Sequence, residues 1–229
     1  IIYLLDFIKK IYIQSKKWLQ ASPWLLKATK DGKKRMVILQ DPSSFGSIPV
    51  YKSENQYAGL EFSYAMWINI DDWSYRYGSW KHILHKGNET SWPLRTPGIW
   101  LHPKENSLRV YMNTYKNIGE HVDLKNLPLG KWFHIVVAVK QNKLDIYLNG
   151  NLAKRHELEA LPKQNWGDIY INSFRGFGGY LSNIRYYNWY TSFSDIDRAL
   201  NTPPSTSGCV DTKGIIPPYF STTWWANQN

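Results

Sequence analysis

The clearest alternation of apolar and polar residues lies just past the middle of the chain. Residues 136–140 and 144–148 alternate with a period of two, the pattern of a strand with one buried face, and a short polar break that contains Gln141-Asn142 separates them. Asn149-Gly150 follows, and this pair readily supplies the positive φ values that a type I′ turn needs. The pattern therefore predicts a β-hairpin and then a tight turn into a third strand.

Shorter apolar runs, separated by Gly, Pro and Asn, predict further strands at 62–70, 83–87, 97–101, 108–111, 167–171 and 179–188. No segment shows helical periodicity long enough to indicate an α/β fold. Twelve Trp and sixteen Tyr favour strands and half-buried faces. The chain has 229 residues. That length suits one all-β sandwich of about 150–170 residues with extensions.

The ordered series of runs resembles the concanavalin A-like jelly roll, and within it the laminin G-like branch, over roughly residues 45–202. The segments that carry the resemblance are Gly130-Lys-Trp-Phe-His-Ile-Val, Leu144-Asp-Ile-Tyr-Leu-Asn-Gly, Phe62-Ser-Tyr-Ala-Met-Trp-Ile and Gly179-Tyr-Leu-Ser-Asn-Ile-Arg. One departure is Ser182-Asn183, where the family often has an acidic residue.

The resemblance implies an antiparallel two-sheet jelly-roll sandwich, and the sequence outside it predicts a helical N-terminal arm and an extended C-terminal tail. We expect three parts. Residues 1–35 form a basic amphipathic arm or membrane-proximal helix, residues 36–202 form the laminin G-like domain, and residues 203–229 form a Pro/Ser/Thr-rich tail.

Positive charge is concentrated in the arm. Residues 1–35 contain nine Lys and Arg against two Asp, a net +7 of the chain's +10. Apolar residues at helical spacing predict an amphipathic helix, but its longest apolar run is too short for a bilayer, which needs ~20 residues. The sequence leaves open the cytoplasmic end of a transmembrane helix, an in-plane helix or a protein-docking helix. Candidate contacts to a membrane or partner are Lys9, Lys10, Lys16, Lys17, Trp18 and Trp24. The chain begins without Met, so we expect a processed product or part of something longer.

The sequence predicts no enzyme. Retaining glycosidases need two carboxyl groups about 5–5.5 Å apart, and no alternating carboxylate array occurs. The nearest candidate, Glu157-Leu-Glu159, is interpreted as a solvated face, and His82 and His85 as two unrelated side chains, because positions i and i+3 of a strand point to opposite faces. His134 matches a histidine that is usually structural in the family.

No metal site or cofactor is predicted, and Ca²⁺ stays open because oxygen ligands from scattered loops leave no readable pattern. The available carboxylates are Asp71, Asp72, Asp123 and Asp168. Cys209 is the one cysteine, so the chain can form no internal disulfide, which points to assembly in a reducing compartment.

Aromatic loops provide candidate ligand-binding surfaces. The loop 71–80 carries four aromatic residues and an arginine, and a Gly-rich loop follows Arg175. Aromatic rings stack on sugars and dominate protein interfaces, but large rings are also often mostly buried. The candidate ligand-binding residues are Trp73, Tyr75, Arg76, Tyr77, Trp80 and Arg175. A third cluster comprises Tyr186, Tyr187, Trp189 and Tyr190.

The layout is also similar, more loosely, to laminin G-like modules in structural proteins of large DNA viruses. That similarity implies a non-enzymatic, membrane-linked minor capsid protein, located in the virion beneath or within the capsid shell near a membrane. Its partners would be other capsid or assembly proteins and a membrane surface or transmembrane anchor. The alternative is a carbohydrate-binding lectin module, membrane-anchored or extracellular, with glycans as partners. Nucleic acid is not an expected partner.

Overall fold

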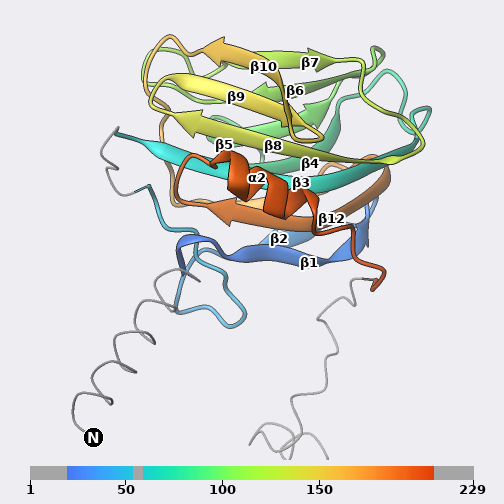
Figure 1. Cartoon of the computed structure of the whole chain (residues 1–229), viewed down its shortest axis with the longest axis horizontal. Helices are drawn as coiled ribbons and strands as arrows, with labels where there is room; N and C mark the ends of the chain where they lie inside the picture. Colours follow the sequence, from blue (N-terminus) through green and yellow to red (C-terminus); the bar gives the residue numbers. More distant parts are fainter. Residues whose placement is uncertain (1–19, 54–58, 209–229) are drawn as a thin grey trace, which may run out of the picture.

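Two six-stranded antiparallel sheets pack face to face (Figure 1) in the computed structural model, which describes residues 20–53 and 59–208. The β3 sheet has the strand order β1-β12-β3-β8-β9-β10, and the β4 sheet has the order β2-β11-β4-β5-β6-β7. The β3 sheet comprises β1 (Trp24–Asp31), β12 (Gly178–Tyr187), β3 (Glu61–Asp72), β8 (Trp132–Lys140), β9 (Lys143–Leu148) and β10 (Asn151–Glu157). The β4 sheet comprises β2 (Met36–Ile38), β11 (Asp168–Ile171), β4 (Lys81–Gly87), β5 (Arg95–Leu101), β6 (Ser107–Tyr111) and β7 (His121–Lys125). The predicted two-sheet jelly-roll sandwich is confirmed.

The core lies between the two sheets. Alternate residues of β3 and β8 point into it, and residues of β5 and β6 face them from the other sheet. The fully buried side chains include Met66, Ile68, Ile83, Ile99, Leu101, Leu108, Phe133 and Ile135. Because each such side chain contributes about 1.5–3 kcal/mol on burial, this layer is the main source of stability.

The predicted hairpin and turn are present. Strands β8 and β9 pair from Ile135 to Lys140, and β10 pairs with β9 after the turn at Asn149-Gly150. Both turn residues have positive φ, 49° and 84°. The Asn149 side chain accepts a hydrogen bond from the backbone N–H of His134 at 2.8 Å, which fixes the turn against the start of β8.

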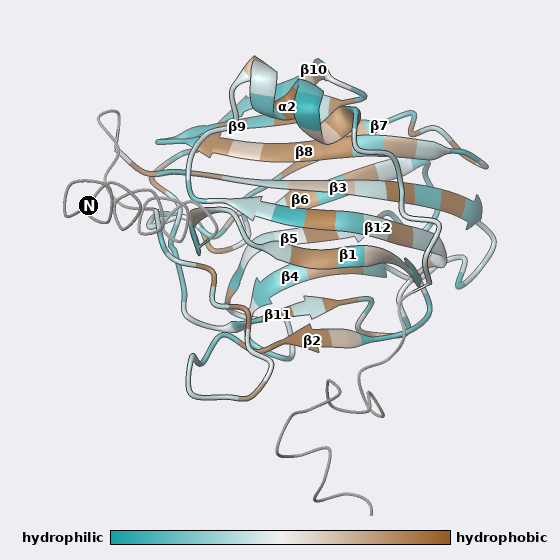
Figure 2. Ribbon diagram, turned by 60° about the horizontal axis from the view of Figure 1, so that its bottom comes forward, coloured by the Kyte–Doolittle hydropathy of each residue, from teal (hydrophilic) through white to brown (hydrophobic). Residues whose placement is uncertain are grey.

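A short helix, α2 (Phe193–Leu200), was missed by the sequence analysis and changes the expected burial of β8. The strand is buried on both faces because α2 covers the outer face of the β3 sheet (Figure 1). Ile196 of the helix packs there on Ala65, Val136 and Ala138. Figure 2 shows β8 as hydrophobic along most of its length, in keeping with a strand that has no solvent-facing side.

The sequence itself contains the signal for this helix. Ser192 is its N-cap, and its side chain accepts from the backbone of Asp195 while the Asp195 carboxylate accepts from the N–H of Ser192. This reciprocal pair is a capping box, with aspartate in place of the usual glutamate or glutamine. Eight residues are too few for periodicity to detect reliably.

The predicted boundary between arm and domain, at residues 35/36, needs correction. Strand β1 lies inside the predicted arm and pairs with β12, and β2 pairs with β11. Five of the nine basic residues of 1–35 therefore belong to the sandwich or its first turn, and Trp24 packs under the guanidinium of Arg185 rather than on an arm. The sequence analysis missed this strand because its lysines were assigned to a basic arm, although lysine is common in edge strands such as β1.

The first part of the predicted tail lies along this edge strand. Thr29 bonds to Ser207 through its backbone, and Ser205 donates its N–H to the Ser182 hydroxyl at 2.9 Å. Asn183 donates to the carbonyl of Pro203 at 2.7 Å. The two residues that depart from the family pattern, Ser182 and Asn183, thus hold the start of the tail.

The remaining predictions for the two ends lie outside the described residues. These are the helical arm up to residue 19 with its contacts Lys9, Lys10, Lys16, Lys17 and Trp18, and the tail from Cys209 onward. Within residues 20–53 and 59–208, no helix has the length and apolar character needed to cross a membrane.

Candidate functional site

Two loops that the sequence analysis selected separately meet at one end of the sandwich. The hydroxyl of Tyr75 donates to the carbonyl of Arg175 at 2.9 Å, and the guanidinium of Arg76 donates to the carbonyl of Phe174. Gly78 also bonds to Pro103 of a third loop at 3.0 Å. The loop 71–80 is therefore fixed at several points, so its side chains are presented on a defined surface.

The rings of this loop differ in exposure. Tyr77 is 63% exposed and Phe174, across the contact, is 41% exposed. Trp80 is partly buried between the ring of His102, 5.2 Å away, and the guanidinium of Arg109, 4.8 Å from its centroid. Trp73 packs against the main core and has the Lys81 ammonium 4.7 Å from its ring. We call Tyr77, Trp80 and Phe174 the aromatic rim. Trp73 is a largely structural ring.

The two histidines of β4 were predicted to be unrelated, and this prediction is wrong. His82 Nε2 lies 2.7 Å from His85 Nδ1. The pairing with β5 shifts register between His82 and Leu84, so Ile83 and Leu84 both face the core. This bulge adds one residue to the strand and brings both histidines to the outer face of the β4 sheet.

The histidine pair has one self-consistent set of proton positions. Ser173 donates its N–H to His82 Nδ1 at 2.9 Å, which places the His82 proton on Nε2. That proton is donated to His85 Nδ1, and His85 Nε2–H is donated to the carbonyl of Asn88 at 2.8 Å. Burial lowers the pKa of His82 well below its ordinary value and the pKa of His85 to about 4. Both rings are therefore neutral and structural at pH 7.

Aromatic rings continue from this pair along the outer face of the β4 sheet. Tyr170 stacks on His85 with centroids 4.9 Å apart, and Trp100 packs edge-on against His82 at 4.5 Å. Phe174 then stacks on Trp100 at 5.4 Å. The rim of the loops thus continues into a row of packed, mostly buried rings on the outer side of this sheet.

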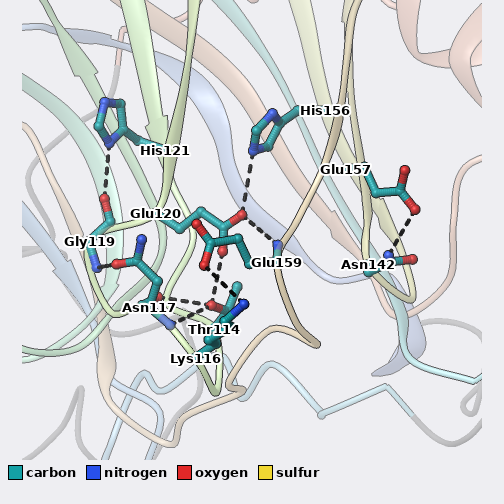
Figure 3. Close-up of polar contacts among 10 residues, drawn as sticks. All are labelled: Thr114, Lys116, Asn117, Gly119, Glu120, His121, Asn142, His156, Glu157 and Glu159. Atoms are coloured by element: carbon teal, nitrogen blue, oxygen red, sulfur yellow. Dashed lines mark hydrogen bonds and ion pairs between the residues drawn. The ribbon is translucent and has the colours of Figure 1, made fainter.

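The candidate carboxylates Glu157 and Glu159 do not form a catalytic pair (Figure 3). Glu157 accepts from the amide of Asn142 at 3.2 Å, whereas Glu159 lies 3.9 Å from the ammonium of Lys116. Both residues are exposed. Their separate partners are those of a solvated strand end, as the sequence indicated.

Figure 3 shows a buried carboxylate beside them that the sequence analysis missed. Glu120, 6% exposed, accepts from the hydroxyl of Thr114 at 2.9 Å and from the N–H of Glu159 at 2.8 Å. His156 Nε2 of β10 lies 3.5 Å away. Because Glu120 immediately precedes β7, these contacts join the edge strands of the two sheets. Glu120 therefore links the edges of the two sheets on this side of the sandwich.

The aspartates considered for calcium lie in separate interactions. Asp123 accepts two hydrogen bonds from Arg109, both at 2.7 Å, and Asp168 accepts from the N–H of Gln40 at 2.8 Å. Asp72 accepts from Ser74 and Tyr75 within its own loop, while Asp71 is exposed. Within the described part of the chain, no three His, Cys, Asp or Glu side chains are grouped so as to hold a metal.

The rings of the third aromatic cluster have a structural role, because they pack in the interior or beside α2. The Tyr186 hydroxyl is buried and donates to the carbonyl of Tyr51 at 2.7 Å, and burial raises the pKa of Tyr186 well above its ordinary value. Tyr187, Trp189 and Tyr190 lie under or beside α2. These rings support the helix rather than a ligand surface.

A small cavity lies near Lys86, beneath the segment 50–52. Its volume of about 20 Å³ suffices for about one water molecule and not for a sugar ring. The buried ammonium of Lys86 donates to the carbonyls of Asn165 at 3.0 Å and Gly167 at 2.6 Å. Burial lowers the pKa of Lys86 to about 8.

Comparison with known families agrees with this architecture. A sequence profile described as the concanavalin A-like lectin/glucanases superfamily, of laminin G type, matches residues 45–196. The chain belongs to this family. Strands β1 and β2 precede the matched region and each lie at one edge of a sheet. The expected family membership is confirmed, whereas the viral capsid setting remains a prediction.

Solved structures with the same fold include binding domains of bacterial toxins. The binding domain of botulinum neurotoxin DC, in complex with SialylT, has a TM-score of 0.50 and 16% identity, over 62% of this chain and 35% of its own. The botulinum neurotoxin serotype G binding domain has a TM-score of 0.53 and 11% identity, over 76% and 46%. The chain spans less than half of these structures, and such identities show the fold alone. No curated protein sequence matches the chain.

Proposed function

We propose that this laminin G-like domain is a non-catalytic glycan-binding module. The observation that carries the proposal is the aromatic rim, whose exposed and half-buried rings lie on two loops joined by hydrogen bonds from the side chains of Tyr75 and Arg76 to backbone carbonyls. Rings held in advance lose little conformational freedom when a sugar stacks on them. The complex of a similarly folded toxin domain with SialylT is consistent with a sugar ligand.

The test is glycan-array binding by the full chain, followed by affinity measurements on single variants. Tyr77→Ala and Trp80→Ala should each weaken binding about tenfold or more, by analogy with other aromatic stacking contacts worth ~1–3 kcal/mol. The matched control is Phe193→Ala, which removes an 80% exposed ring from the other side of the sandwich and should leave affinity unchanged. An array without hits for the intact protein would contradict the proposal.

A second proposal places the domain in a membrane-linked assembly, as a minor capsid component in the virion shell of a large DNA virus. Its support is the basic sequence before β1 and the arrangement of both ends of the described chain. The residues leading into β1 and residues 205–208 both lie at the β1 edge. Extensions from one edge could tether the domain while leaving the aromatic rim accessible.

Vesicle co-sedimentation of the full chain tests the membrane link. Each lysine near an anionic leaflet contributes about 1 kcal/mol, screened by salt. Replacing Lys9, Lys10, Lys16 and Lys17 with Gln should therefore abolish binding to phosphatidylserine vesicles. The control replaces four exposed sandwich lysines, Lys34, Lys104, Lys131 and Lys143, and should bind like the parent. Equal loss in both variants, or no binding by the parent, would remove the membrane role.

A further inference from the structure

Arg95 occupies an unusual position on the outer face of the β4 sheet. It is the first residue of β5, and its stem fills the space left by Gly98. A Cβ on Gly98 would lie 3.2–3.4 Å from the Cβ, Cγ and Cδ of Arg95. The guanidinium carbon then lies 3.6 Å from the ring centroid of Tyr111 and 5.5 Å from that of Trp92. The cation is thus held flat against the sheet between aromatic rings.

The charge of Arg95 is not compensated, in contrast to its neighbours on this sheet. Arg109 is paired with Asp123, and Arg35 with Glu89. None of the carboxylates in residues 20–53 and 59–208 forms an ion pair with Arg95, and its Nε is buried without a hydrogen-bond partner. A half-buried charge without a counter-ion is costly and is usually kept for a partner.

A second donor without an acceptor lies on the same strand and face. Trp100 is 8% exposed, and its indole N–H has no hydrogen-bond partner within the described residues. The ring of Phe174 stacks on it at 5.4 Å and covers it. Phe174 is itself 41% exposed on the turn before β12, so the ring that covers the indole lies at the protein surface. An arginine and an indole donate hydrogen bonds and accept none.

We propose that this surface, the Arg95 site of Arg95, Trp100 and Tyr111, binds the carboxylate of an acidic sugar. The inference rests on the glycan-binding function proposed above, and it names the ligand class. The planar guanidinium fork matches two carboxylate oxygens, which a lysine cannot do. The rings of Tyr111 and Trp92 flank the cation and offer apolar faces to the sugar ring.

The test uses the full chain and pairs of oligosaccharides that differ in one terminal sugar. In the first pair, one member ends in sialic acid and the other lacks that sugar. In the second pair, one member ends in a uronic acid and the other ends in the corresponding neutral hexose. The acidic member should bind at least ~10-fold tighter, since a hydrogen bond to a charged group is worth more than a neutral one. Arg95→Lys should lower affinity for the acidic member about 10- to 100-fold and leave the neutral member unchanged. Trp100→Phe keeps the ring and should give a smaller loss.

The control is Arg35→Lys, just before β2, whose guanidinium is exposed, lies over the ring of Tyr170 and is already paired with Glu89. It should bind like the parent, and urea unfolding should confirm that all variants fold. Equal affinity for both members of a pair, or full acidic-sugar binding by Arg95→Lys, would overturn the inference and leave glycan binding standing. If neither member binds, glycan binding fails and the inference fails with it.

Discussion

The outer faces of the two sheets differ in what covers them and in the residues they carry. The β3 sheet presents small and apolar residues outward, and α2 covers them with Ile196. The outer side of the β4 sheet carries no helix within the described residues, and loops instead cover its buried histidines and stacked rings, with three arginines at their margin. A helix therefore stabilises one face of this sandwich, and the other face carries the surface proposed for recognition. Four predictions test that division.

The largest effect of a single substitution is expected beneath the helix. Ile196→Asp would place an unpaired carboxylate at a 2% exposed position, which should lower the free energy of unfolding by about 4 kcal/mol. The matched change on the same helix, Phe193→Asp, alters an 80% exposed residue at the helix N-terminus and should cost less than about 0.5 kcal/mol. Urea denaturation measures both. Similar losses in the two variants would show that α2 does not act as a cover.

The Ile196 change is the largest single substitution, whereas acidification acts on three buried histidines together and should have a larger total effect. The pKa values of His85 and His134 are lowered by burial to about 4, and that of His82 is also well below its ordinary value. Below pH 6.5 the unfolded chain takes up protons that the folded protein does not, so stability falls as the pH drops towards 4.

His85 alone should account for about 3 kcal/mol between these limits. Unfolding free energies at pH 7.5 and pH 4.5 measure the total, in a range largely above the titration of ordinary carboxylates. The variant His85→Gln should show a smaller difference between the two pH values. An unfolding free energy independent of pH over this range would mean that the histidines are not buried as described.

Removing the Glu120 contacts between the edges of the two sheets should lower the free energy of unfolding by an intermediate amount. Glu120→Ala leaves the N–H of Glu159 without its acceptor and removes one of the two acceptors of the Thr114 hydroxyl, which should cost about 2 kcal/mol. Glu157→Ala, one strand end away and exposed, should change stability by less than about 0.5 kcal/mol. The melting temperatures of the two variants, compared with that of the parent, test this difference. Equal melting temperatures would show that the buried carboxylate does not join the edges.

The smallest stability effect is expected at the aromatic rim. Tyr77→Ala removes a 63% exposed ring and should change the free energy of unfolding by less than about 0.5 kcal/mol. A loss of glycan affinity with unchanged unfolding would sharpen the division between a stabilising and a recognising face. A destabilisation of 2 kcal/mol or more would instead make the rim part of the core.

Much of the fold could be predicted because its signals are local. The period-two runs identify β8 and β9, and Asn149-Gly150 adopts the turn that its backbone preferences favour. The ordered motifs indicated the family over roughly residues 45–202, and the family profile matches residues 45–196. The lysine-rich strand β1 was not predicted from the sequence, because its assignment depends on pairing with β12, about 150 residues away along the chain.

The candidate site depended more on tertiary structure. The sequence indicated that loop 71–80 and Arg175 carry aromatic and basic groups, but only the fold brings Tyr75 to Arg175. A bulge in β4, which leaves no sequence signal, brings His82 and His85 together on one face. The uncompensated charge of Arg95 has the same origin. The sequence determines which residues are present and how each strand alternates, whereas strand register decides which of them face each other and which cation lacks a counter-ion.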